Sequence, residues 1–160
     1  MTIRRSNPGK QGEIGLGAAI AWFLGEGYGV SVPLCDNQPY DLIIDSKADG
    51  LQKVQVKTST RRGPIRELPG STKSDSHDSV QICTRGGNQS FHTVKYWDPE
   101  ASDLLFILSD DGDIYVIPSR DVTTRTTINL CEKYERYRRA RWHIPETAQQ
   151  MVVGGGFEPP

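Results

Sequence analysis

Two apolar segments separated by a short polar turn constrain the first half of this chain most strongly. Residues 40–45 (YDLIID) and 51–59 (LQKVQVKTS) are typical of strands, and Asp49-Gly50 between them is a hairpin turn signal. Valines alternate with polar residues along the second segment, so Gln55 and Lys57 lie on one face of the strand. The sequence therefore predicts an antiparallel hairpin with a polar face.

Other segments predict a sheet with helices beside it. Asn7-Pro8 is typical of a helix start, and Asn129 with Glu132 resembles a capping box. Helices are expected at 9–24 and 129–141, and further strands at 28–34, 79–84, 91–97, 104–108 and 114–117. The continuous apolar run 104–108 indicates a central, buried strand. The expected fold class is α/β (α+β), a mixed β-sheet flanked by helices.

Length and composition fit one globular domain. The 160 residues carry a formal net charge of −1 and 24% charged residues, while bases gather locally in 61–66 and 133–141. We expect a domain over 1–146, an exposed loop at 60–78 and a disordered tail over 147–160. Three widely spaced cysteines fit a reducing cytoplasm, and no segment reaches the ~20 apolar residues of a membrane span.

One group of side chains predicts hydrolytic chemistry. Asp41 begins the first strand of the hairpin, Gln55 and Lys57 share a face of the second, and Glu13 lies on the preceding helix. Phosphodiester hydrolysis needs a divalent cation, an activated water and charge stabilisation at the phosphate. Asp41, Glu13 and the backbone carbonyl of Val56 are the candidate metal ligands for Mg²⁺, for which Mn²⁺ substitutes. Gln55 offers a neutral oxygen, and Lys57 offers an ammonium beside the phosphate.

Each residue also has a simpler interpretation. Asp41 could be a turn residue, Gln55 and Lys57 a solvated face, and Glu13 the partner of Lys10 in a surface ion pair. Convergence on adjacent, otherwise apolar strands favours a site.

The order Glu13, Pro39-x-Asp41, Gln55-x-Lys57 resembles the PD-(D/E)XK nuclease superfamily. Within it, the chain is similar to a small group that includes the homing endonuclease of a group I intron in a cyanobacterial tRNA gene. Segments 103–122 and 133–137 extend the resemblance to most of the chain. It implies a bacterial enzyme that makes a site-specific double-strand break with Mg²⁺, acting as a dimer or tetramer. Gln55 departs from the pattern, which usually has an acid there.

The last residues supply an independent hypothesis. Gly156-Phe157-Glu158-Pro159 is encoded by GGG-TTC-GAA-CCC, which closely matches the T-arm of tRNA genes. This match predicts a reading frame that runs from an intron into a tRNA gene.

A long DNA target requires many contacts to phosphates and base edges. The candidates lie at the end of the catalytic strand, in the loop after it and on the predicted hairpin at 79–97, where solvated surface charge is the alternative. They are Thr58, Ser59, Arg61, Arg62, Arg66, Lys73, Gln81, Arg85, Asn88, Gln89 and Lys95. The basic stretch 133–141 has two interpretations, a contact to DNA phosphates or cover for a subunit interface.

Two other functions remain open at this point. A restriction, repair or junction-resolving nuclease would use the same Asp41 and Lys57. A non-catalytic DNA-binding module of the same fold is permitted by Gln55, which reduces the negative charge available to a cation.

Overall fold

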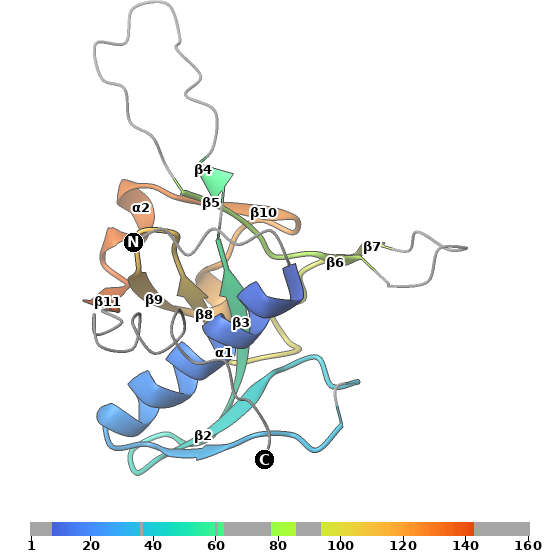
Figure 1. Ribbon diagram of the computed structural model, residues 1–160. Helices are drawn as coiled ribbons and strands as arrows, with labels where there is room; N and C mark the ends of the chain where they lie inside the picture. The colour runs from blue at the N-terminus through green and yellow to red at the C-terminus, as the bar shows by residue number, and fades with distance from the viewer. Residues whose placement is uncertain (1–7, 36, 60, 63–77, 86–93, 143–160) are drawn as a thin grey trace, which may run out of the picture.

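The computed structural model describes residues 8–35, 37–59, 61–62, 78–85 and 94–142 (Figure 1). Two α-helices and one 3-10 helix accompany eleven strands in this part of the chain. In chain order they are α1 (Pro8–Gly25), β1 (Gly29–Ser31), β2 (Leu42–Ser46), β3 (Gly50–Thr58), β4 (Arg61–Arg62), β5 (Asp78–Gln81), β6 (Thr84–Arg85), β7 (Val94–Lys95), β8 (Leu104–Leu108), β9 (Asp113–Pro118), η1 (Ser119–Asp121), β10 (Thr127–Leu130), α2 (Glu132–Glu135) and β11 (Arg138–Arg141).

The central sheet has six strands in the order β1-β2-β3-β8-β9-β11. Only β3 and β8 run parallel; the other neighbours are antiparallel, so the sheet is mixed as the sequence predicted. The predicted hairpin is β2–β3, and its turn ends at Gly50, whose φ of 74° favours glycine. Strand β8 is the buried central strand expected from its apolar run, with Leu105 and Phe106 fully buried.

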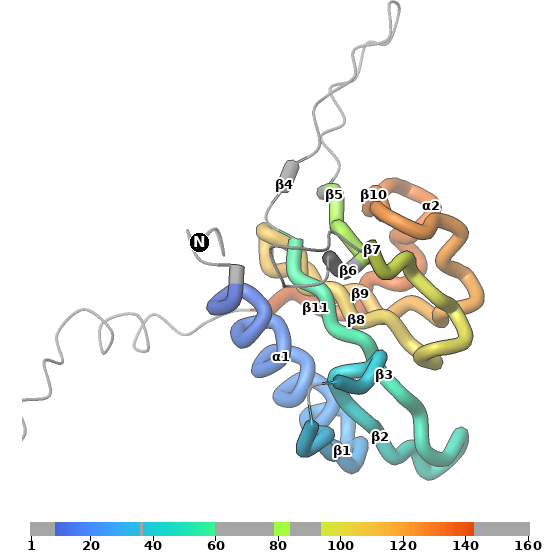
Figure 2. Tube along the Cα trace, turned by 90° about the vertical axis from the view of Figure 1, so that its right-hand side faces the viewer, coloured from blue at the N-terminus to red at the C-terminus, as the bar shows by residue number. Residues whose placement is uncertain are grey.

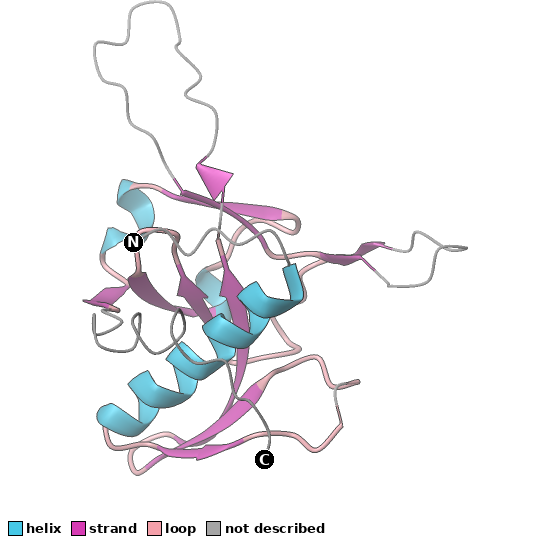
Figure 3. Ribbon diagram, in the orientation of Figure 1, coloured by secondary structure: helices cyan, strands magenta, loops and turns pink. Residues whose placement is uncertain are grey.

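The central sheet is the middle of three layers (Figures 1 and 2). Helix α1 covers one face, where Phe23, Leu42 and Phe106 form part of one buried cluster. A small sheet of order β10-β5-β4 covers the other face, where Ile128 and Tyr134 pack against Leu105 and its neighbours. The colouring by secondary structure shows that α1 is the long helix and that the opposite layer is mostly strand (Figure 3).

The predicted helix at 129–141 is wrong. Its first part is β10, which pairs with β5 and buries Ile128 and Leu130 on alternate positions. Its last part is β11, which completes the central sheet against β9. Only Glu132–Glu135 is helical, and its N-cap is Cys131, without a side-chain capping bond, rather than Asn129. The burial of alternating apolar side chains and two strand pairings outweigh a local capping pattern.

The predicted strand at 79–84 becomes two short strands. The backbone N–H groups of Ile82 and Cys83 both donate to the carbonyl of Thr126, at 2.9 and 3.2 Å, where the strand is interrupted between β5 and β6. Strand β6 pairs with β7, so the expected hairpin between 79–84 and 91–97 is present only at Thr84 and Arg85, whereas β5 pairs with β4 and β10.

Candidate active site

Asp41 lies immediately before β2 and is held against β3 by three hydrogen bonds. Its backbone N–H donates to the carbonyl of Val54 at 2.8 Å. Its carboxylate oxygen Oδ2 accepts from the side-chain amide of Gln55 at 2.5 Å and from the backbone N–H of Val56 at 2.6 Å. The convergence of Asp41 and Gln55 predicted from the alternation of β3 is therefore present in the structure.

Gln55 and Lys57 lie on the face of the sheet opposite α1. Val54 packs into the cluster beneath the helix, so the odd-numbered residues of β3 point the other way. Leu105 and Ile107 are their register partners on β8, and both belong to the cluster under the small sheet. Asp41 is bonded to Gln55, so all three polar side chains lie on the side of the central sheet that the small sheet partly covers.

Burial has opposite effects on the two charged groups of this site. Burial raises the pKa of Asp41, although the Val56 N–H, the Lys57 charge and the Gln55 amide each oppose the shift. Burial lowers the pKa of Lys57, and the charges of Asp41 and Cys83 oppose that shift. A carboxyl with a raised pKa close to a lysine with a lowered pKa is typical of functional sites. Burial of two ionisable groups is costly for stability, and catalysis often needs pKa values that are shifted in this way.

An open groove of about 1110 Å³ gives access to these residues. Pro39, Asp41, Gln55 and Lys57 line one wall, and the segment after β7 together with residues 122–125 lines the rest. The groove is large enough for a phosphodiester strand rather than for a single ion.

The oxygen atoms around Asp41 decide whether a divalent cation fits here. Within the described ranges, no three His, Cys, Asp or Glu side chains come together as a metal site. Asp41 is the one carboxylate beside Gln55, and the amide –NH₂ of Gln55 is directed at it. The oxygen and nitrogen of an amide exchange positions when the group rotates by about 180°. Such a rotation would place the Gln55 oxygen beside Asp41 instead. Asp41, the Gln55 oxygen and the Val56 carbonyl therefore fit a hard cation, with few ligands and a single charge.

The structure does not bring Glu13 to this group. Glu13 is exposed on α1, whereas Gly15 packs against Thr58 on β3. Two residues correspond to roughly 200° around a helix, so Glu13 faces away from the sheet. A role for Glu13 stays a prediction, and it has no support from proximity to Asp41.

Two predicted DNA contacts have structural partners of their own. The hydroxyl of Thr58 donates to the carbonyl of Gln11 on α1 at 3.0 Å. The hydroxyl of Ser59, which is 1% exposed, donates to the carbonyl of Ser79 at 2.9 Å. These bonds attach the end of β3 to the layers on both sides, and they favour a structural role over contact with DNA.

The remaining predicted DNA contacts are placed unequally. Lys95 is exposed and lines the groove, and Gln81 is exposed with its amide 3.3 Å from the sulfur of Cys83. The backbone of Arg61 and Arg62 pairs with β5, and that of Arg85 with β7. Outside the described residues lie Arg66, Lys73, Asn88 and Gln89.

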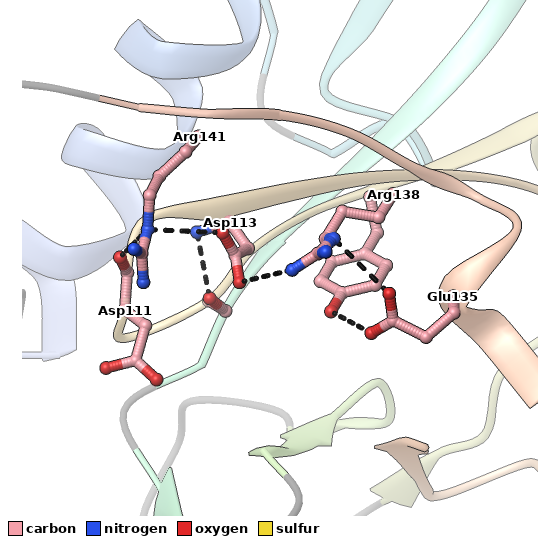
Figure 4. Close-up of polar contacts among 7 residues, drawn as sticks. Asp111, Asp113, Glu135, Arg138 and Arg141 are labelled. Carbon is pink, nitrogen blue, oxygen red and sulfur yellow. Dashed lines mark hydrogen bonds and ion pairs between the residues drawn. The ribbon is translucent and has the colours of Figure 1, made fainter. Parts of the chain in front are cut away.

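Two arginines of β11, Arg138 and Arg141, form ion pairs with neighbouring acids (Figure 4). Asp113 lies between Arg138 and Arg141, at 3.5 and 3.3 Å from their guanidinium nitrogens. Glu135 pairs with Arg138 at 3.3 Å and accepts from the hydroxyl of Tyr115. These contacts attach β11 to β9, so the basic stretch of the sequence contains structural ion pairs rather than a free cationic helix.

Sequence reasoning missed the far wall of the groove. Tyr96 is 56% exposed there, Trp97 is buried, and the guanidinium of Arg125 lies 5.3 Å from the centre of the Tyr96 ring. Two signals were available: adjacent aromatics directly after Lys95, and a lone arginine within the run Thr123-Thr124-Arg125-Thr126-Thr127.

Comparison with known proteins identifies the family of the chain. The sequence profile of a family described as PD-(D/E)XK endonuclease matches residues 6–145. The chain therefore belongs to the PD-(D/E)XK endonuclease family, and it is an endonuclease, a hydrolase. Asp41, Gln55 and Lys57 remain the candidate site residues, and their role in the reaction stays a prediction.

Among solved structures, one described as a bacterial homing endonuclease, I-Ssp6803I, has the same fold. The TM-score is 0.62 at 23% identity, with 92% of this chain and 94% of that chain covered. No curated protein matches the sequence. Among the described residues, no helix is long and apolar enough to cross a membrane.

Proposed function

We propose that this endonuclease makes a site-specific double-strand break in DNA, that the reaction depends on Mg²⁺ or Mn²⁺, and that its role is the homing of a group I intron in a tRNA gene. The observation that supports catalysis best is the junction of Asp41, Gln55 and Lys57 on one wall of an open groove. A purely structural polar cluster would not need access from a groove of this size.

The chain's own residues have distinct tasks in this proposal. Asp41, the Gln55 side-chain oxygen and the Val56 carbonyl would hold the cation, which polarises the phosphate and lowers the pKa of a bound water. Lys57 places its ammonium beside the scissile phosphate and stabilises the charge that develops on its oxygens. The lowered pKa of Lys57 also makes this amine a better proton carrier for the attacking water than an exposed lysine.

The biological context rests on two separate observations. The similar solved structure is described as a homing endonuclease, and at 23% identity it supports the fold. The C-terminal peptide Gly156-Phe157-Glu158-Pro159 matches the coding sequence of a tRNA T-arm. We therefore place the target in the uninterrupted tRNA gene, where an intron would be inserted.

Cutting both strands requires two active sites. The described part of one chain contains one Asp41–Lys57 cluster, so we propose a homodimer or homotetramer on double-stranded DNA. Light scattering of the purified protein, alone and with a target duplex, would show one chain per complex if this part of the proposal is wrong.

A cleavage assay tests the proposal directly. Linear DNA containing the uninterrupted tRNA gene of the same genome is incubated with Mg²⁺ or with EDTA, and Lys57→Ala is the control. We expect a single Mg²⁺-dependent cut near the anticodon region, which Lys57→Ala abolishes while DNA binding persists.

Other outcomes would select the alternatives. Cleavage of other or branched DNA, with the tRNA gene intact, would indicate a restriction, repair or junction-resolving enzyme. Specific binding without cleavage under any divalent cation would indicate a non-catalytic module, which the substitution of an acid by Gln55 makes the main competitor.

A further inference from the structure

Tyr96 and Arg125 form a cation–aromatic pair that lines the same groove as the candidate catalytic residues. The guanidinium of Arg125 lies 5.3 Å from the centre of the Tyr96 ring, and both side chains are exposed and line the groove. Asp41 and Lys57 line the same groove from β3 and the segment before β2. The charge of Arg125 is therefore exposed to the same groove as the candidate catalytic residues.

The backbone that supports this pair is fixed by hydrogen bonds. The N–H of Trp97 donates to the carbonyl of Arg125 at 2.9 Å, and the N–H of Ile82 donates to the carbonyl of Thr126 at 2.9 Å. Trp97 and Ile82 are both buried in the cluster under the small sheet. Arg125 thus projects from a rigid support, which lowers the entropy lost when its side chain binds a ligand.

The charge of Arg125 is less compensated than that of other arginines. Arg138 and Arg141 each pair with Asp113. Across the described residues, no carboxylate forms an ion pair with Arg125. Asp98 also lines the groove, but its carboxylate accepts from the backbone N–H of Glu100 at 3.0 Å. The guanidinium of Arg125 lies over an aromatic ring and has no carboxylate partner among the described residues, and its fork of donors matches the geometry of a phosphate diester.

We infer that Arg125 binds a backbone phosphate of the DNA strand that lies in the groove over Asp41 and Lys57, and that Tyr96 is the positioning residue for its guanidinium. This inference rests on the proposed function, because it supposes that DNA occupies the groove. It assigns a DNA contact to the wall formed by residues 96–97 and 122–125. The contact is electrostatic and independent of base sequence.

The salt dependence of DNA binding tests the inference. Binding of a fluorescein-labelled duplex is measured by anisotropy with Ca²⁺ in place of Mg²⁺, over a series of salt concentrations. Loss of one phosphate contact reduces the slope of log K against log salt by about 0.9, and we expect this reduction in Arg125→Gln. Arg120→Gln is the matched control, since Arg120 is exposed on η1 and does not line the groove.

The role of Tyr96 is tested by a double-mutant cycle. Tyr96→Leu is expected to weaken binding several-fold in the otherwise unchanged protein and to have little further effect in Arg125→Gln. Tyr96→Phe, which keeps the ring, is expected to bind like the unchanged protein. Thermal unfolding of each variant reports any loss of folding separately.

The outcomes separate the two proposals. If the unchanged protein binds and cuts DNA but Arg125→Gln has the slope of Arg120→Gln, the inference is wrong and the proposed function stands. If the Tyr96→Leu and Arg125→Gln effects simply add, Tyr96 does not act through Arg125. If the unchanged protein neither binds nor cuts any duplex, both proposals fail.

Discussion

The carboxylate of Asp41 and the side-chain amide of Gln55 are joined by a 2.5 Å hydrogen bond across the β2–β3 hairpin. Asp41 is thus held by a neutral partner, at the position where the motif that the sequence resembles usually has an acid. Two carboxylates at this separation would repel each other without a cation, whereas an amide stabilises the carboxylate. We expect this exchange to favour a folded, metal-free protein at the expense of cation affinity.

Gln55→Glu should reverse this balance. A second carboxylate beside Asp41 is expected to lower the Mg²⁺ concentration needed for half-maximal cleavage by about tenfold or more. The metal-free variant should melt at a lower temperature than the parent, because it loses the amide bond and gains like-charge repulsion. Cleavage over a series of Mg²⁺ concentrations measures the first effect, and thermal unfolding with and without Mg²⁺ measures the second. A Mg²⁺-dependent rise in Tm no larger than that of the parent would contradict this prediction.

Lys57→Met should abolish cleavage and stabilise the fold. Burial lowers the pKa of Lys57, so the folded protein binds fewer protons than the unfolded chain between the lowered and the ordinary pKa. Stability therefore rises with pH across that window, and the charged ammonium is unfavourable below it. We expect an increase in Tm of about 2–4 °C at neutral pH, corresponding to ~1 kcal/mol. Lys53→Met, an exposed position on the same strand, is the control and should leave Tm unchanged.

At subsaturating Mg²⁺, where Asp41 is mostly free of the cation, the cleavage rate should fall at low pH with a midpoint above that of an ordinary aspartate (~3.9). Burial raises the pKa of Asp41, and the protonated acid is a poor ligand for a cation. The folded protein also holds more protons than the unfolded chain between the ordinary and the raised pKa, so ionisation of Asp41 reduces stability as pH rises through that window. Rates measured over pH in the parent and in Asp98→Asn test the assignment. If the low-pH limb of the rate profile shifts in Asp98→Asn, that limb belongs to Asp98 and the assignment to Asp41 is wrong.

Two glycines on α1 should respond differently to alanine. A Cβ at Gly15 would lie 3.0 Å from Cγ2 and 3.1 Å from Oγ1 of Thr58, whereas nothing lies within 4 Å of one at Gly17. Gly17→Ala is expected to stabilise the protein by about 0.5–1 kcal/mol through helix propensity. Gly15→Ala should gain less or lose stability, because Thr58 is fixed by its bond to Gln11. Urea unfolding compares them. Equal gains would show that α1 does not pack this closely on β3.

Thr58→Ser provides the matched background for that comparison. It removes Cγ2 but keeps the hydroxyl that donates to Gln11. Gly15→Ala should be less costly in Thr58→Ser than in the parent by a measurable coupling energy.

The sequence by itself determined the central elements and the groove wall that contains Asp41 and Gln55. Helix α1, the β2–β3 hairpin and the buried strand β8 follow from local periodicity, a turn signal and an apolar run. Asp41 and Gln55 meet because one hairpin separates them and the side-chain period of a strand is fixed. Short sequence separation makes such a contact readable without knowledge of the rest of the fold.

The tertiary structure decided what surrounds that wall. Residues 127–130 and 138–141 become strands because β5 and β9 offer them backbone partners, and no local pattern in the sequence records those partners. A backbone hydrogen bond from Trp97 to Arg125 brings Arg125 beside Tyr96, and the β11–β9 pairing turns two arginines of β11 toward Asp113. Which cations remain available for DNA depends on contacts between residues far apart in the chain, and such contacts are set by the burial of apolar surface in the whole domain.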